Sequence, residues 1–360
     1  MSPLSPATLQ SRRIGATALS LGILAVIAIG FVLKAAQGVV VPLIIAWLLS
    51  YLLAPVVNFL VRRLRFPAPL AVTCVVILLL LASWGTGIVI QQRLLAFAKA
   101  FPEYEQRLES LLAQYGSQLE IPAFALKDAD WTAQLGPIVL KTSRFFIGFI
   151  SNAVLVMIFL VFMLLAKPYA NDKLRAAFSA GRADAIIASS NAISRQISAY
   201  LGALFIISLV TGLCVWGALA WLGIEFAFTW GLLAFLLNFV PTLGSIVASI
   251  PPVLMALVQR APDLWPAVAT AAILLVIQMT LGNFIAPKVY GDRLNLSPVV
   301  ILLFLVFWGW LWGVVGALLA VPIAAAIQIA LAQIPALAPL AVLMGSGKKY
   351  ARKNSPPPDA

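Results

Sequence analysis

Residues 226–258 have the sequence FAFTWGLLAFLLNFVPTLGSIVASIPPVLMALV, which is apolar almost from end to end. A continuous helix of this length would measure about 50 Å, whereas the hydrocarbon core of a bilayer is about 30 Å thick. Near the middle, Pro241 lacks a backbone donor and Gly244 tolerates unusual backbone angles. We therefore expect a helix break here, whose unpaired backbone groups must face protein or a wet cavity because lipid cannot satisfy them.

Two interpretations of this break remain open. Asn238, Thr242 and Ser245 supply polar side chains beside it, and many secondary transporters bind their substrate at interrupted helices. The break is then part of a transport site. In the alternative interpretation, the stretch is a proline-kinked span whose hydroxyl groups only bond the kinked backbone.

The composition of the chain is that of a membrane protein. Of its 360 residues, 62% are hydrophobic and 10% are charged, against about 45–50% and about 25% in soluble domains. Apolar runs long enough to cross a bilayer occupy residues 14–33, 39–60, 70–90, 145–166, 200–223 and 264–284, and the longer stretches are 226–258 and 297–334. The sequence therefore predicts an all-α, polytopic integral membrane protein.

Several function classes are disfavoured. The net charge of +12 comes from short basic groups beside the apolar runs, which is an orientation signal of membrane proteins and not a nucleic-acid-binding tract. The chain has no histidine, and its two cysteines, Cys74 and Cys214, lie inside apolar runs. With no Gly-rich phosphate loop either, we expect no catalytic residues, no metal and no cofactor.

Charge also predicts the topology. Basic groups follow the positive-inside pattern if a tail of residues 1–13 and a basic, disordered tail of residues 344–360 are cytoplasmic, flanking a transport domain of residues 14–343. Residues 91–143 are then an extracytoplasmic helical insert, and residues 167–199 contain a cytoplasmic amphipathic helix. Stretches 226–258 and 297–334 would each be a hairpin of two short helices. The alternative for each is one long tilted span.

The insert carries a heptad seam about three repeats long. We expect a new helix to begin near Pro102, because proline suits the first turn of a helix. The seam lies against the membrane domain or the lipid surface, or it joins two copies of the chain, and the first alternative is preferred because aromatic residues are poor seam formers. Its members are Leu94, Phe97, Phe101, Tyr104, Leu108, Leu111 and Tyr115.

A second polar group lies further along the chain. Gln278 and Asn283 are amides inside an apolar run, and Pro287 and Gly291 follow them. We expect a second proline break here. Polar residues in a membrane span are costly, and these neutral groups suit a small, uncharged, hydroxylated solute. The alternative is that the amides only bond neighbouring helices. Acidic residues are nearly absent from the apolar runs, which argues against strong ion coupling.

Small residues mark the last apolar stretch. Gly309, Gly313 and Gly316 form a face that permits close helix contact. We expect this contact within the proposed hairpin, although such a face also occurs in helix dimers.

Four motifs in order carry a family resemblance. They are PLIIAWLLSYLLAP at residues 42–55, NFVPTLGS at 238–245, a set running from Gln278 to LSP at 296–298, and Gly313 to AVP at 320–322. Together they resemble the autoinducer-2 exporter family over residues 40–335. The resemblance implies about eight membrane segments, an oligomer, and transport. It further implies export of autoinducer-2, a small polar compound, or sodium–proton exchange in some members. Many relatives carry an acid where this chain has Leu281, and its absence weakens ion coupling.

Three hypotheses follow. The first is an exporter of a small polar solute in the bacterial inner membrane, with both termini cytoplasmic, whose path is lined by Asn238, Thr242, Ser245, Gln278 and Asn283 and shaped by Pro241, Gly244, Pro287 and Gly291. The second is a sodium (lithium)/proton antiporter. The third is a membrane scaffold that acts through the insert at residues 91–143. The predicted partners of the protein are the solute, the lipid bilayer and other copies of the chain, but no nucleic acid.

Overall fold

The computed structural model describes residues 24–25, 28–115, 153–240, 243–260, 263–290 and 296–346. Within these ranges the chain is helical and contains no β-strand, and one isolated antiparallel bridge joins Leu296 to Gly345. The named elements are α2 (Gln37–Arg63), α3 (Ala68–Tyr115), η1 (Lys167–Tyr169), α6 (Ala170–Ala177), α7 (Ala180–Trp221), α8 (Ala227–Leu237), α9 (Leu243–Gln259), α10 (Trp265–Gln278), η2 (Met279–Ile285), α11 (Ala286–Tyr290), α12 (Pro298–Ala332) and α13 (Ala338–Leu343). The all-α prediction is confirmed.

Among the described residues, six helices are long and apolar enough to cross a membrane, and α8 and α9 are shorter apolar helices. The six lie at Gln37–Arg63, Ala68–Val89, Ala153–Ala177, Ala180–Trp221, Trp265–Ile285 and Pro298–Ala332. Many of their large apolar side chains are exposed, for example Phe162 and Trp221. Lipid is the environment in which such exposure is favourable, so the protein is a multi-pass membrane protein. The predicted first span, residues 14–33, lies mostly outside the described residues.

Local sequence signals explain where helices end. α7 ends at Trp221, two residues before Gly223, whose φ of +67° is a conformation that glycine adopts readily. The Ile224 amide donates to the Leu219 carbonyl oxygen over 2.9 Å, and the Gly223 amide donates to the Ala220 carbonyl oxygen over 3.1 Å. This pair of bonds is the Schellman motif, which satisfies the last carbonyl groups of a helix.

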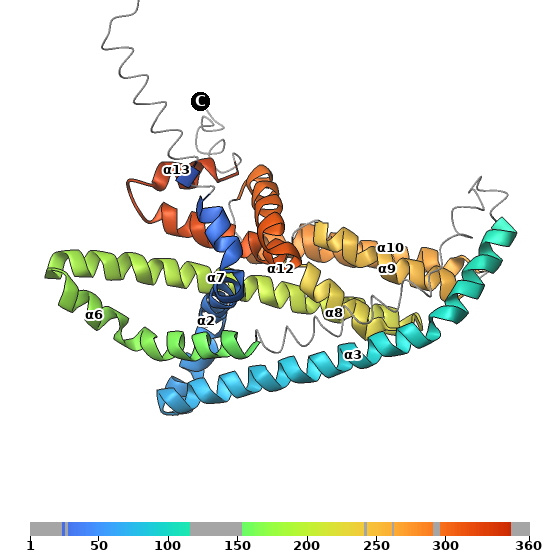
Figure 1. The fold of residues 1–360 in the computed structure, drawn as a ribbon, viewed down its shortest axis with the longest axis horizontal. Coiled ribbons are helices and arrows are strands. Elements are labelled where there is room, and N and C mark those ends of the chain that lie inside the picture. The colour runs from blue at the N-terminus through green and yellow to red at the C-terminus, as the bar shows by residue number, and fades with distance from the viewer. Residues whose placement is uncertain are drawn as a thin grey trace, which may run out of the picture.

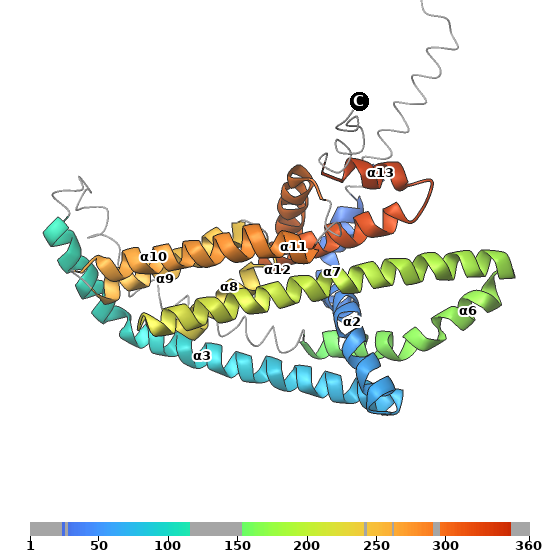
Figure 2. The ribbon, with the colours of Figure 1, turned by 180° about the vertical axis from the view of Figure 1, so that it is seen from behind.

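α7 is the central element (Figure 1). It has 42 residues, so it is about 63 Å long, twice the thickness of a bilayer core. It contacts α2, α6, α8, α10, α11 and α12. Figure 2 shows α3 along one side of α7, with α9 and α10 on the other and α2 crossing it steeply. Side chains from α2, α7 and α12 form one core, and those from α7 to α10 form a second.

One expectation about the insert is wrong. α3 continues from the third span to Tyr115 as a single helix, so no new helix begins at Pro102. All seven seam residues lie on this helix, and the surface that their side chains contact stays a prediction. Residues 116–143, the rest of the insert, lie outside the described residues.

Both long apolar stretches are interrupted, as predicted. Residues 226–258 form α8 and α9, and residues 297–334 contain α12, in which Trp312 (φ −126°, ψ 16°) and Gly313 (φ 63°, ψ −143°) leave the helical conformation. α12 therefore consists of two helical halves, residues 298–311 and 314–332. Figure 1 shows the two halves running in different directions from this point.

Candidate functional site

The side chain of Gln259, at the end of α9, bonds to the residues just before α8. The Gln259 amide nitrogen donates to the Gly223 carbonyl oxygen over 2.9 Å, and the Glu225 backbone amide donates to Gln259 Oε1 over 2.9 Å. The end of α9 therefore returns to the residues from which α8 starts. The preference for a hairpin over one tilted span is confirmed for residues 226–258.

The turn of this hairpin is tight. The amide of Gly244 donates to the Val240 carbonyl oxygen over 2.9 Å. A Cβ atom on Gly244 would overlap the carbonyl oxygen of Leu237 at the end of α8. Glycine is therefore required here because of the close backbone approach, as its position beside the predicted break suggested. Pro241 and Thr242 lie outside the described residues.

Asn238 ends α8 and is bonded to α7. Its side-chain nitrogen donates to Ser208 Oγ over 3.0 Å, and Ser208 is completely buried. Asn238 itself is half-buried. A buried polar pair of this kind lies in a low-dielectric environment, where a hydrogen bond is strong and the loss of one partner is costly.

Small residues allow α7 and α8 to come this close. A Cβ on Gly212 would lie 2.8 Å from the Gly231 carbonyl oxygen, and a Cβ on Gly231 would lie 2.6 Å from Cβ of Trp216. Both distances are shorter than real Cβ contacts. The two glycines thus permit the backbone approach that brings Asn238 within reach of Ser208, as small residues do in membrane helix pairs.

Ser245 lies in the first turn of α9 and is half-buried. Its carbonyl oxygen accepts a hydrogen bond of 2.9 Å from the Ser249 hydroxyl. Ser249 therefore bonds its own helix. Ser245 lies on the opposite side of the turn from Asn238, so the hairpin positions both predicted residues at the same break.

The second polar group has a different backbone from the one expected. The chain stays helical through Pro287, in α11, but residues Met279–Ile285 form a π-helical segment. Pro287 has no N–H to donate to the carbonyl oxygen of Asn283, four residues earlier, which fits a local change of hydrogen-bond pattern. Such π segments occur frequently at functional sites. Gly291 lies outside the described residues.

Gln278 and Asn283 are not joined to Asn238 by any hydrogen bond that the described residues make. Asn283 is exposed, and its side-chain nitrogen lies 3.1 Å from Met279 Sδ, one turn earlier. Gln278 is half-buried at the end of α10. The common neighbour is α7, which contacts α8, α10 and α11.

The break in α12 is lined differently. A Cβ on Gly316 would overlap the carbonyl oxygen of Trp308, and a Cβ on Gly309 would lie 3.8 Å from Cβ of Ala317. The small residues therefore face the other half of α12. The ring centroids of Trp308 and Trp312 lie 4.5 Å apart, with the ring planes tilted by 41°. The Trp312 indole donates to the Leu33 carbonyl oxygen over 3.2 Å.

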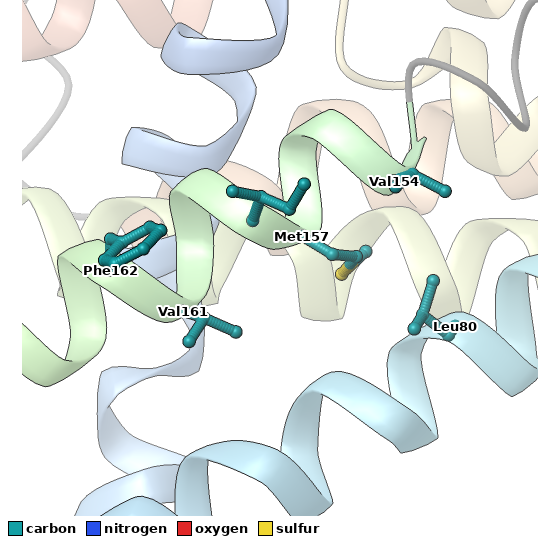
Figure 3. A pocket seen from close by; sticks show the side chains of 6 residues that line it. Leu80, Val154, Met157, Val161 and Phe162 are labelled. Atoms are coloured by element: carbon teal, nitrogen blue, oxygen red, sulfur yellow. The ribbon is translucent and has the colours of Figure 1, made fainter.

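A third feature is an apolar crevice of about 330 Å³ between α3 and the helix that begins at Ala153. Figure 3 shows Leu80 of α3 facing Met157, with Val154, Val161 and Phe162 along the same helix. All six lining residues are apolar, and none belongs to the predicted path. The crevice offers no hydrogen bond to a polar solute.

Sequence reasoning missed the buried hydroxyl residues of α7 and α10. Ser208, Thr211 and Thr270 are buried polar residues with exposures of 0%, 1% and 0%. Each is a short hydroxyl side chain inside an apolar run, which usually bonds its own helix, as Thr211 does to the Ile207 carbonyl oxygen over 2.8 Å. Nothing local distinguishes Ser208 from Thr211, so the pairing of Ser208 with Asn238 required the fold.

Charge and metal chemistry contribute little in the described part of the chain. No group of three His, Cys, Asp or Glu side chains able to hold a metal occurs among those residues. The site is therefore built from neutral donors and acceptors at the ends of apolar helices.

The comparisons with known proteins decide the family. A model described as AI-2E family transporter matches residues 21–336. This chain belongs to the AI-2E family. The AI-2 transport protein TqsA of Escherichia coli (strain K12) is 33% identical over 340 residues, covering 91% of this chain and 95% of that protein. A putative transport protein of Borreliella burgdorferi is 31% identical over 315 residues, covering 88% and 87%.

A more distant relative is named for a different activity. A sodium-lithium/proton antiporter of Halobacillus andaensis is 25% identical over 328 residues, covering 84% of this chain and 90% of that protein. The resemblance drawn from the four motifs is confirmed, and this AI-2E family protein is a membrane transporter.

Proposed function

We propose that this AI-2E family protein exports a small polar solute, with autoinducer-2-like compounds as the first class to test. The observation that carries the proposal is the Asn238–Ser208 hydrogen bond of 3.0 Å at the interrupted α8–α9 hairpin. A broken helix at membrane depth is tolerated where it is buried in protein or lines a wet cavity. The similarity to TqsA, an AI-2 transport protein, supports the solute class.

The chemistry of the pair suits a hydroxylated, uncharged solute. An amide side chain carries two donors and an acceptor, and the bond to Ser208 uses one donor of Asn238. A solute hydroxyl or carbonyl group exchanges with Ser208 at similar energy, because one neutral hydrogen bond replaces another. Ser245, on the far side of the break, adds a second hydrogen-bonding group to the same path.

The test is flux through purified protein in vesicles loaded with an autoinducer-2-type furanone. Asn238→Leu is expected to reduce flux at least about tenfold, since a lost neutral hydrogen bond and an unpaired Ser208 together cost about 1.5–3 kcal/mol. Gln278→Leu tests the predicted continuation of the path and is expected to reduce flux less.

Ser50→Ala is the matched control, because the Ser50 hydroxyl bonds the Trp47 carbonyl oxygen of its own helix over 2.7 Å. It should leave flux unchanged. Wild-type flux through correctly inserted Asn238→Leu and Gln278→Leu proteins would refute the proposed path.

A second candidate is cation–proton exchange, favoured by the similarity to the Halobacillus sodium-lithium/proton antiporter. Backbone carbonyl groups at a broken helix are able to hold a sodium ion without a carboxylate. Vesicles containing the protein and an internal pH dye distinguish cation–proton exchange from solute export. Dissipation of a pH gradient on addition of sodium or lithium supports exchange, and a gradient that only the furanone disturbs supports export.

We further propose a homo-oligomer in the bacterial inner membrane with both termini cytoplasmic. Asn283 supports the oligomer because it is a polar side chain on an exposed, apolar part of η2, where lipid contact is unfavourable. Native mass spectrometry of the detergent-solubilised protein tests the subunit number. Single cysteines at positions 260 and 290, labelled from each side, test the topology, and labelling of position 290 only from outside would contradict it.

A further inference from the structure

Two adjacent prolines, Pro251 and Pro252, lie in the interior of α9. A proline has no N–H, so neither residue donates to the carbonyl oxygen four positions earlier, of Val247 and of Ala248 respectively. The Ala248 oxygen also lacks the donor three positions later, because that residue is Pro251. The chain stays helical through the prolines, so α9 contains two consecutive gaps in its hydrogen-bond ladder.

These gaps mark the place where α9 bends most easily. Sharp bends in helices occur mostly at proline, and here two of the hydrogen bonds that normally resist bending are missing. The part of α9 before the prolines, residues 243–250, is about 12 Å long. A bend of about 20° at the prolines moves the first residue of α9 by about 4 Å, which is longer than a hydrogen bond.

The part of α9 after the prolines is fixed. Met255 and Ala256 are buried in the core that α7 to α10 share. Gln259, the last residue of α9, bonds the Gly223 carbonyl oxygen and the Glu225 amide. This half of α9 therefore keeps its position relative to α7 and α8 when the helix bends at the prolines.

The first half of α9, residues 243–250, is attached more weakly. Ile246 and Ile250 are 61% and 52% exposed. The Ser249 hydroxyl bonds its own helix, and in the described part of the chain no side chain of this half makes a hydrogen bond to another helix. Apolar contact of Ala248 attaches it to the shared core.

α8, on the other side of the break, is held against α7. The close approach at Gly212 and Gly231 and the bond from Asn238 to Ser208 join these two helices. When α9 bends, Asn238 therefore stays in place and Ser245, in the first turn of α9, moves. The bend changes the separation of the two polar side chains that border the break.

We propose that α9 is hinged at Pro251 and Pro252, and that this hinge opens and closes the break between Asn238 and Ser245. In the open position a solute reaches the Asn238 amide, and in the closed position the first half of α9 covers it. The inference rests on the proposed function, because the hinge controls the path assigned to those two polar residues. Hinges of a few residues control the closure of many proteins around their ligands.

The test measures distances between paired spin labels in the full-length protein carrying Cys74→Ser and Cys214→Ser. The reference label is at Gln196→Cys, an exposed position of α7. The second label is at Ile246→Cys, before the prolines, or at Leu254→Cys, after them, and both positions are exposed. The hinge predicts a broad or two-peaked distance distribution for the Ile246→Cys pair and a narrow one for the Leu254→Cys pair. These measurements require no solute.

Pro251→Ala combined with Pro252→Ala returns both missing N–H groups to α9. The distribution of the Ile246→Cys pair should then become single and narrow, and solute flux should fall several-fold, because the break no longer opens. Pro55→Ala is the matched control, since Pro55 is an exposed proline inside α2, and it should change neither measurement. Pro252→Ala alone, which returns a donor to Ala248, repeats the test if the double variant does not insert.

Three results would overturn the proposal. The first is an equally narrow distribution for both label pairs with the two prolines in place. The second is a broad distribution that survives both alanine substitutions, since the motion would then lie elsewhere. The third is undiminished flux through a double alanine variant whose distribution has become narrow. Failure of the proposed path gives a different result, in which Asn238→Leu keeps its flux while the alanine substitutions still narrow the distribution and lower the flux, and this result leaves the hinge in place.

Discussion

The two apolar hairpins, α8–α9 and α12, differ in what surrounds their breaks. The α8–α9 break has Asn238 on one side and Ser245 on the other, and Asn238 bonds to buried Ser208 of α7. The α12 break has two tryptophan rings in contact and a close glycine contact. A helix break alone therefore does not define the proposed transport path, which we assign to the α8–α9 break because of the neutral polar side chains there.

The largest expected effect is a loss of stability when the glycine at either turn is replaced by alanine. Gly244→Ala and Gly316→Ala each place a Cβ atom against a backbone carbonyl oxygen, of Leu237 and of Trp308. The backbone cannot move aside without opening the turn, so each variant should lose about 3 kcal/mol or more of stability. Thermal unfolding in detergent measures this. Gly217→Ala, in open space on α7, is the control, and equal stability of all three variants would contradict the tight turns.

The next effect concerns the hydrogen bond between α7 and the α8–α9 break. Ser208→Ala removes the acceptor of the Asn238 amide and should cost about 1–3 kcal/mol as well as lowering flux. Thr211→Val, three residues later, removes a hydroxyl group that bonds only its own helix, and should cost less and leave flux intact. If both variants behave alike in stability and flux, Ser208 has no special role.

A smaller effect concerns the open end of α8–α9. Gln259→Ala removes two hydrogen bonds to the α7–α8 turn. The side chain is half-buried, and the loss should be about 1 kcal/mol. Hydrogen exchange at the Glu225 amide measures it, and we expect faster exchange there with unchanged exchange in the middle of α7. Unaltered exchange at Glu225 would show that Gln259 does not hold the hairpin closed.

The smallest expected effect lies at the α12 break. The Lys34 ammonium group is 4.8 Å from the centroid of the Trp310 ring, and such a contact contributes about 0.5–1 kcal/mol at an exposed site. Lys34→Met should lower the thermal stability slightly and leave flux unchanged, in contrast to Asn238→Leu. Lys173→Met, at an exposed position on α6, is the control. A large loss of flux in Lys34→Met would mean that the α12 break also lines the path.

The sequence predicted those features that depend on short-range chemistry. Length, together with Pro241 and Gly244, predicted the α8–α9 break, and the excess length of residues 297–334 predicted a break in α12. The family followed from four ordered motifs. These features are local because a glycine or a proline acts on the backbone within one turn.

Features that depend on packing were not predictable. Asn238 finds its partner 30 residues earlier in the chain, and the local sequence around Ser208 does not indicate which helix will face it. The π-helical segment at Met279–Ile285 replaced an expected break at Pro287, because the chain accommodates a missing donor in more than one way. The expected start of a helix at Pro102 failed for the same reason, since the first turn of a helix is only one place for proline.

The most direct test of the account compares water access at the two breaks. Ser245→Cys and Ala317→Cys are both half-buried positions just after a break, and each is introduced with Cys74→Ser and Cys214→Ser. The account predicts that a small, charged thiol reagent modifies Ser245→Cys rapidly, that the transported solute slows this reaction, and that Ala317→Cys stays unmodified. Modification of Ala317→Cys with protection of Ser245→Cys from the reagent would contradict it, because the path would then lie at α12.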